Sequence, residues 1–163
     1  MRDFRRYAAV VAGFATVFYL ALLVAGFGVL SLLLNRDVIS DPNAGPIAGP
    51  VMTGVSVAIV LACLLAIALR IPKEKQRVSL QGAFLVGFGA YFFFAVAGGI
   101  LLGAGRGDAF GFVISLGTQL LSPFAITAGV LAFVVVLLFM IVIASQVGDR
   151  GRPRWPWEKR DDE

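Results

Sequence analysis

Four polar side chains recur at helical spacing within the last apolar stretch of the chain: Ser115, Thr118, Gln119 and Ser122. Positions i, i+3, i+4 and i+7 share one face of a helix. Hydroxyl and amide groups on such a face can line a solute pathway or a ligand pocket. They can also point toward lipid headgroups, as in an amphipathic helix at the membrane interface, or the helix can pack beside a bundle. A third arrangement, one long tilted span without a break, gives this face no special role.

Ionisable residues are missing where membrane chemistry would need them. The long apolar stretches contain no Asp, Glu, Lys or Arg, and the whole chain contains no His. Carriers coupled to protons or cations usually keep an ionisable group inside the membrane. An intramembrane serine protease needs a base beside its nucleophile, and no His is available for that role. His is also the commonest metal ligand. We therefore expect no catalytic residue, no metal and no cofactor, and the sequence argues against an enzyme.

A glycine-rich segment, "GAGRGDAFG" at 103–111, partly matches a dinucleotide-binding G-x-G-x-x-G. Asp108 stands where the last glycine should be, and that fingerprint also needs a preceding strand in a βαβ unit. The segment follows an apolar helix instead, so we do not expect it to bind a nucleotide. Asp37 and Asp41 lie in a Pro- and Gly-rich connection. We expect them to be surface turn residues, and a weak cation site there is the less favoured alternative.

The elements that would position these residues are membrane helices. An apolar run of about 18 residues or more with few charges is typical of a membrane span. The sequence predicts an all-α protein whose 1–147 domain has spans at 7–34, 50–69, 80–102 and 124–146. Pro123 interrupts the last apolar stretch, because proline ends or kinks a helix, so a separate short amphipathic helix is expected at 109–122. Ser79 is a plausible N-cap for the third span.

Basic residues predict how the chain is threaded. Twelve of the fourteen lie in the N-terminus, the connection between the second and third spans, and the tail. Cytoplasmic segments carry the excess of Lys and Arg. Four spans place all three basic segments on one side, so we expect both termini in the cytoplasm and 35–49 and 103–111 outside. The expected location is a bacterial plasma membrane, crossed several times, and the first apolar stretch is too long for a cleaved signal peptide.

Small residues form stripes along the second and third spans. Such stripes let helix backbones approach closely in lipid. We expect the two spans to pack tightly within the bundle, although one stripe could instead face a second copy or another membrane protein. The residues are Gly54, Ala58, Ala62 and Ala66 in the second span and Ala83, Gly87, Ala95 and Gly99 in the third.

Both tryptophans, Trp155 and Trp157, lie in the basic tail 148–163, near Arg152 and Arg154. Tryptophan prefers the headgroup level of a bilayer, and clustered Arg and Lys attract anionic lipid. We expect the tail to anchor at anionic headgroups of the cytoplasmic face, and we expect no nucleic acid as a partner. The alternative is a docking motif for a protein, because exposed Trp and Arg are frequent interface anchors.

The tail also carries a family resemblance. The segments "RPRWPWE" and "RRYAAVVAGF", together with four spans in 163 residues, resemble a group of small uncharacterised membrane proteins from actinobacteria. The resemblance implies the same four-span plan. It brings no catalytic or binding residue with it.

Two functional hypotheses follow from these observations. The first is a non-catalytic accessory or scaffold protein, which acts through helix packing and its basic cytoplasmic face. The second is a small transporter or channel for an uncharged or apolar solute. A water-accessible path would distinguish them, and its lining would come from Thr16, Ser56, Thr127 or the face from Ser115 to Ser122.

Overall fold

The computed structural model describes residues 2–35, 38, 47–70, 78–106 and 109–147. Within them the chain forms five helices and no strand, so the predicted all-α class is confirmed. The helices are α1 Arg2–Leu34, α2 Ala48–Arg70, α3 Leu80–Arg106, α4 Ala109–Leu120 and α5 Pro123–Val147.

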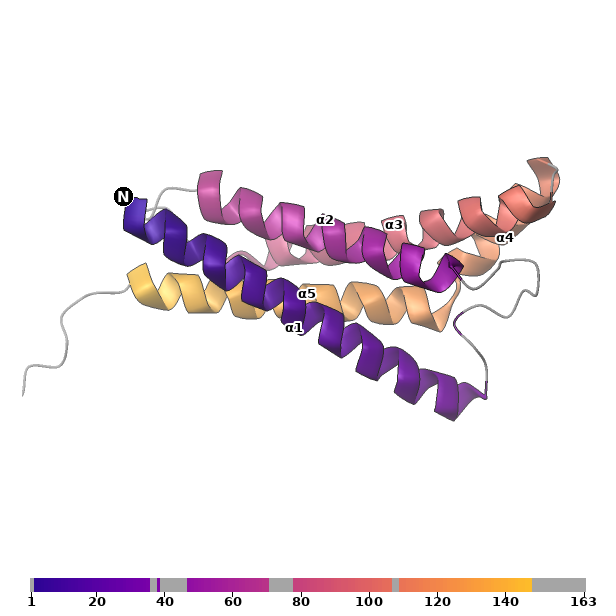
Figure 1. Ribbon diagram of the computed structural model, residues 1–163, viewed down its shortest axis with the longest axis horizontal. Coiled ribbons are helices and arrows are strands. Elements are labelled where there is room, and N and C mark those ends of the chain that lie inside the picture. Colours follow the sequence, from indigo (N-terminus) through magenta and orange to yellow (C-terminus); the bar gives the residue numbers. More distant parts are fainter. Residues whose placement is uncertain (1, 36–37, 39–46, 71–77, 107–108, 148–163) are drawn as a thin grey trace, which may run out of the picture.

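Four of these helices, α1, α2, α3 and α5, are long and apolar enough to cross a membrane. The apolar part of α1, Arg6–Leu34, has 29 residues. At 1.5 Å per residue its length is about 43 Å, which exceeds the ~30 Å hydrocarbon core. Figure 1 shows α1 crossing its neighbours obliquely, and a tilted helix fits a longer apolar stretch into the same thickness.

The four long helices form a closed ring, and α2 and α5 also touch across it. α1 packs against α2 and α5, and α3 packs against the same two helices from the other side. The start of α1 and the end of α5 lie at the same end of the bundle (Figure 1). This arrangement is what four successive crossings require.

Local signals explain where the helices begin and end. The Ser79 hydroxyl accepts a hydrogen bond from the backbone N–H of Gly82 at 3.1 Å, so the predicted N-cap of α3 is confirmed. The predicted break at Pro123 is also confirmed, because α4 ends at Leu120 and α5 begins at Pro123. A turn joins them, in which the N–H of Ser122 donates to the carbonyl of Gln119 at 3.1 Å.

Two predicted boundaries differ by four residues or more. α1 begins at Arg2 instead of near residue 7, and α3 continues to Arg106 instead of ending near 102. Its extra turn is supported by α4, which folds back along it. A methyl group added to Gly103 would lie 2.8 Å from the Cα of Phe112. The glycines at this end of α3 therefore let α4 approach its backbone, so they hold the helix against a neighbour and do not interrupt it.

The core lies along the axis of the ring. The buried positions of α2 recur every fourth residue, through Met52, Ser56, Val60 and Leu64. Toward the end of the bundle at which α4 lies, the ring of Phe27 packs against Phe94, with centroids 5.5 Å apart, and against Phe124 at 5.6 Å. These aromatic contacts join α1, α3 and α5.

Candidate functional site

The centre of the bundle contains a hydrogen-bonded pair of hydroxyl groups. The Tyr19 hydroxyl lies 2.7 Å from the Ser56 hydroxyl and 3.0 Å from the carbonyl oxygen of Ala128. The Ser56 hydroxyl is also 3.5 Å from the carbonyl of Ala90. Tyr19 and Ser56 are fully buried. The cluster therefore connects α1, α2, α3 and α5 at one point.

Each of the two hydroxyls has a single proton, so only one arrangement uses the short distances. In that arrangement Tyr19 donates to the carbonyl of Ala128, and Ser56 donates to the oxygen of Tyr19. The reverse arrangement would direct the Ser56 proton to Ala90 over 3.5 Å, which is a weak geometry. Both protons are used within the protein, so this cluster ties the helices together and leaves no free donor for a ligand.

Three further hydroxyls, two of them buried and one exposed, are bonded within their own helices. Thr16 donates to the carbonyl of Ala12 at 2.8 Å, and Ser115 donates to that of Gly111 at 2.7 Å. Thr118 donates to the carbonyl of Ser115, also at 2.8 Å. Hydroxyls bonded in this way add little to the polarity of a pathway.

The four residues of the predicted polar face on the short helix differ in their exposure. Ser115 and Gln119 are buried, whereas Thr118 is exposed and Ser122 is half-buried. The outer surface of α4 is apolar and includes the exposed side chains of Phe110, Val113 and Ile114. An interfacial helix with its polar face toward headgroups would show the opposite orientation. That interpretation is corrected: α4 packs along α3 and turns two of its four polar residues inward.

Gln119 is the largest polar side chain of this face, and it is 7% exposed. Among the described residues no fully buried side-chain nitrogen or oxygen lacks a hydrogen-bond partner, so the Gln119 amide is not a stranded polar group. Its Cγ and Cδ lie against Gly98 of α3, where a methyl group would contact them at 3.0 and 3.1 Å and would also meet Met52 of α2. Gln119 therefore places a carboxamide, which can donate two hydrogen bonds and accept two, between three helices.

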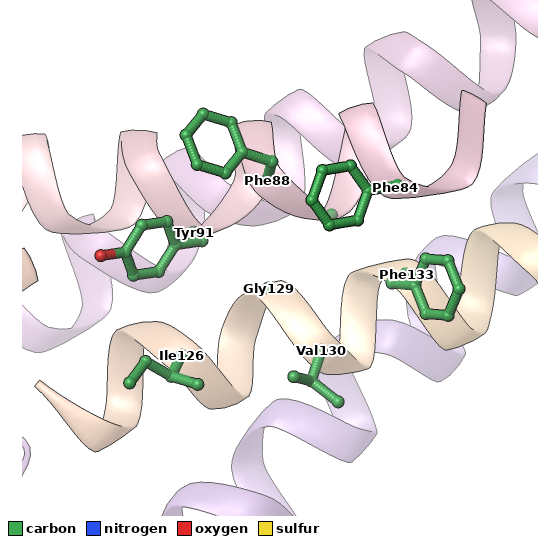
Figure 2. A pocket seen from close by; sticks show the side chains of 8 residues that line it. Phe84, Phe88, Tyr91, Ile126, Gly129, Val130 and Phe133 are labelled. Atoms are coloured by element: carbon green, nitrogen blue, oxygen red, sulfur yellow. The ribbon is translucent and has the colours of Figure 1, made fainter. Parts of the chain in front are cut away.

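A second feature lies on the outside of the bundle, where α3 and α5 meet. Figure 2 shows an open groove there, lined from α3 by Phe84, Gly87, Phe88 and Tyr91 and from α5 by Ile126, Gly129, Val130 and Phe133. The groove encloses about 360 Å³. Volumes of roughly 300–1,000 Å³ are usual for small-molecule sites. Its walls are apolar except for the hydroxyl of Tyr91.

The floor of this groove is a close contact between two helix backbones. A methyl group at Gly87 would lie 2.8 Å from the carbonyl oxygen of Gly129, and one at Gly129 would lie 2.7 Å from the Cβ of Tyr91. Only glycine permits this approach. The Tyr91 hydroxyl is already engaged, since it donates to the carbonyl of Leu120 at 2.7 Å.

One wall of the groove belongs to a row of phenylalanine rings along α3. The rings of Phe84 and Phe88 are nearly parallel, with centroids 6.5 Å apart, and those of Phe88 and Phe92 are similar at 6.3 Å. All three are exposed on the outer surface of α3. They recur every fourth residue, so they form a continuous ridge beside the groove.

The two small-residue stripes are placed differently from each other. Ala83, Gly87, Ala95 and Gly99 are buried in α3, and Gly99 packs against Leu116 of α4. In α2, Gly54, Ala58 and Ala62 are exposed and Ala66 is half-buried. The stripe of α3 therefore lies inside the bundle, where Gly87 meets α5 and Gly99 meets α4. The stripe of α2 faces away from the bundle over most of its length, as the alternative of a second copy or another membrane protein requires.

The anchor residues proposed for the tail, Trp155, Trp157, Arg152 and Arg154, lie outside the described residues, so their role stays a prediction. Among the described residues, no group of three or more His, Cys, Asp or Glu could hold a metal ion.

A family model described as a family of unknown function, DUF6121, matches residues 1–163. The chain belongs to this family. The search of curated proteins and the search of solved structures gave no match. With four membrane-compatible helices, this member of the family is a multi-pass integral membrane protein.

The sequence pointed to Ser56 and to the polar face of α4, but not to Tyr19 or to the groove. Ser56 was among the hydroxyls expected to line a path, whereas its contact with Tyr19, 37 residues away in the chain, has no local signal. The groove had a local signal, the recurrence of Phe84, Phe88 and Phe92 at every fourth position. The meeting of Gly87 with Gly129 had none, because it depends on how α3 crosses α5.

Proposed function

We propose that this protein is a non-catalytic accessory or scaffold protein of a bacterial plasma membrane, with both termini in the cytoplasm. It acts through lateral contacts of its helices and through its basic cytoplasmic segments. The observation that carries this proposal is the small-residue face of α2, formed by Gly54, Ala58 and Ala62, which is exposed. A methyl group added at Gly54 would meet no heavy atom within 4 Å.

An outward small-residue face favours contact with another helix. In lipid, helices associate through close packing, because lipid tails are as apolar as the side chains themselves. Small residues allow the backbones to approach, which increases dispersion contacts and the chance of interhelical hydrogen bonds. The partner is a helix of another membrane protein or of a second copy of this chain.

The interior supports the same proposal. Tyr19 and Ser56 close the centre of the bundle, with their protons directed to partners within the chain. The core around them is filled by apolar side chains, among them Leu23, Leu64 and Val135. A protein that moved solutes along the bundle axis would have to break this hydrogen-bonded contact, whereas a scaffold is stabilised by it.

Photo-crosslinking in intact membranes tests the proposal. A photoreactive amino acid at Ala58 should give a discrete crosslinked product of higher mass, and Ala62→Leu in the same chain should remove it. The matched control places the same photoreactive group at Val17, which is exposed on α1. The thermal stability of Ala62→Leu should equal that of the wild type, because Ala62 is exposed. Equal crosslinking from both positions would contradict a specific partner on α2.

The second candidate, a transporter or channel for an uncharged solute, is favoured by one observation, the carboxamide of Gln119 between α2, α3 and α4. A water-filled path that reached this residue would hydrate its amide. Thiol labelling distinguishes the two functions. In a Cys63→Ala background, Gln119→Cys should resist a membrane-impermeant thiol reagent as fully as Ala132→Cys in the core does. Selective labelling of Gln119→Cys would favour the transporter.

A further inference from the structure

We infer that the C-terminal end of α1, residues 28–34, forms an arm whose angle to the bundle changes with the thickness of the lipid bilayer. The first observation is where the packing of α1 stops. The buried residues of α1 recur at every third or fourth position and end at Phe27: Ala8, Ala12, Thr16, Tyr19, Leu23 and Phe27. The arm contains no buried residue. Leu30 packs only partly against the core, and Leu32 and Leu33 are 84% and 76% exposed.

The second observation is the length of α1. Its apolar stretch has 29 residues, whereas those of α2, α3 and α5 have 22, 25 and 23. At 1.5 Å per residue this difference is about 6 to 10 Å, and the arm itself is about 10 Å long. The arm therefore accounts for the length by which α1 exceeds the other spans. A bilayer that matches the other three spans is too thin for an upright α1, and tilt accommodates the excess.

The rest of α1 is held in place by its neighbours. Ala8 and Ala12 are completely buried, and the Tyr19 hydroxyl joins α1 to α2 and α5. At the boundary of the arm, the ring of Phe27 packs against one ring of α3 and one of α5. These contacts fix the direction of α1 as far as Phe27. A change in tilt is therefore concentrated in the arm.

Figure 1 shows the end of α1 standing apart from the beginnings of α2 and α5 at the same end of the bundle. An arm with few protein contacts can change its angle without breaking any packing, whereas mismatch with the hydrocarbon core costs energy for every ångström. Beyond the arm, Val38 packs against the core again, so the chain is tied to the bundle on both sides and the movement stays small. A thin bilayer should turn the arm away from α5, and a thick bilayer should bring it closer.

Distances between spin labels test this inference in the full-length protein. Cys63→Ala removes the native thiol, and labels are attached at Leu33→Cys on the arm and at Ile126→Cys in the first turn of α5. The protein is reconstituted in phosphatidylcholine with short, intermediate or long monounsaturated chains, so that the hydrocarbon thickness differs while the headgroup stays the same. Double electron–electron resonance measures the separation of the labels.

We expect the two labels to move apart by about 3–4 Å from the longest to the shortest chains. A change of about 20° in tilt lies within the range that membrane helices show, and it moves the end of an arm about 10 Å long by this amount. Leu32→Lys brings a charge into the arm and shortens its apolar stretch, so it should reduce the shift. Leu32→Ile keeps the arm apolar and should leave the shift unchanged.

Two control pairs should keep a constant separation in all three bilayers. Val10→Cys with Ile141→Cys compares the packed part of α1 with α5 at the other end of the bundle. Ile100→Cys with Ile126→Cys compares α3 with α5 at the same end as the arm. All four native side chains are exposed, so labels at these positions do not disturb the core.

Four results would overturn the inference. A constant separation between the labels at positions 33 and 126 would mean that the arm does not respond to thickness, and a larger separation in the thick bilayer would contradict its direction. An equal shift for Val10→Cys with Ile141→Cys would mean that α1 tilts as one rigid rod. An equal shift for the pair on α3 and α5 would mean that the whole bundle deforms. An undiminished shift in Leu32→Lys would mean that the apolar length of the arm is not its cause.

Discussion

The Tyr19 hydroxyl of α1 lies 2.7 Å from the Ser56 hydroxyl of α2, and it donates a hydrogen bond to the carbonyl of Ala128 in α5. Three spans are therefore joined at the centre of the bundle by two side chains. In a membrane the hydrophobic effect does not hold helices together, so such bonds and close packing take its place.

The first prediction tests this connection by a double-mutant cycle. Tyr19→Phe and Ser56→Ala should each lower the stability of the bundle, and the coupling between them should be about 0.6 kcal/mol, with an upper end of about 1.7 kcal/mol. Thermal unfolding in mild detergent measures it. Tyr7→Phe is the control, because Tyr7 is exposed at the start of α1. Strict additivity of the two changes would mean that the hydroxyls do not interact.

The second prediction compares two glycines in membrane spans. Gly87→Ala should destabilise the protein by about 1–3 kcal/mol, the usual cost of overpacking, because the added methyl would lie 2.8 Å from the carbonyl of Gly129. Gly54→Ala should cause no loss, since its methyl meets no heavy atom within 4 Å and alanine favours a helix. The melting temperatures of the two variants measure the change in stability. Similar values for both would contradict the close crossing of α3 and α5.

The contrast between these glycines shows what the sequence can predict. The number of spans, the break at Pro123 and the cap at Ser79 depend on local signals, namely apolar length, proline and a hydroxyl before a helix. Each can be read from a few neighbouring residues. All three predictions are confirmed.

Local signals do not predict which side of a span faces the core. In water, an apolar face marks the core, but a membrane helix is apolar on all sides because lipid is apolar as well. The small residues of α2 therefore predicted a buried face, whereas the buried positions are Met52, Ser56, Val60 and Leu64. The groove depends likewise on Gly87 meeting Gly129, which no local pattern encodes.

The third prediction concerns Gln119. Its side chain is 7% exposed and lies against Gly98 of α3, and an apolar side chain costs less to place there than a carboxamide. Gln119→Leu should therefore leave the thermal stability unchanged or raise it. Ser115→Ala on the same helix is the comparison, because Ser115 is bonded to Gly111. A clear loss of stability for Gln119→Leu would show that the amide is bonded in the membrane, through water or a ligand.

The fourth prediction concerns orientation. Reporter fusions after Gln76 and Asp161 should score cytoplasmic, and fusions after Asn43 and Gly107 should score external. The reason is that twelve of the fourteen basic residues lie in segments that four spans put on one side, and such segments stay in the cytoplasm. An external score for the tail would contradict the four-span arrangement.

The last prediction concerns the tail. We expect Trp155 and Trp157 to hold residues 148–163 at the inner headgroup layer, with help from the four basic residues Arg152, Arg154, Lys159 and Arg160. Each basic residue near an anionic surface contributes about 1 kcal/mol, and salt weakens this attraction. A peptide of residues 148–163 should bind anionic vesicles better than neutral ones. Its tryptophan emission should shift to the blue on binding, and the shift should fade in high salt.

Two changes separate this anchor from a protein-docking motif. Replacing both tryptophans by alanine should weaken vesicle binding, whereas deleting Asp161, Asp162 and Glu163 should strengthen it, because the acids are repelled by the anionic surface. The full-length protein provides the decisive comparison. If the peptide ignores anionic vesicles while Trp155→Ala and Trp157→Ala remove a co-purifying protein from the full-length chain, the tail recognises a protein, and its tryptophans are interface anchors of the kind that bind in a partner's pocket.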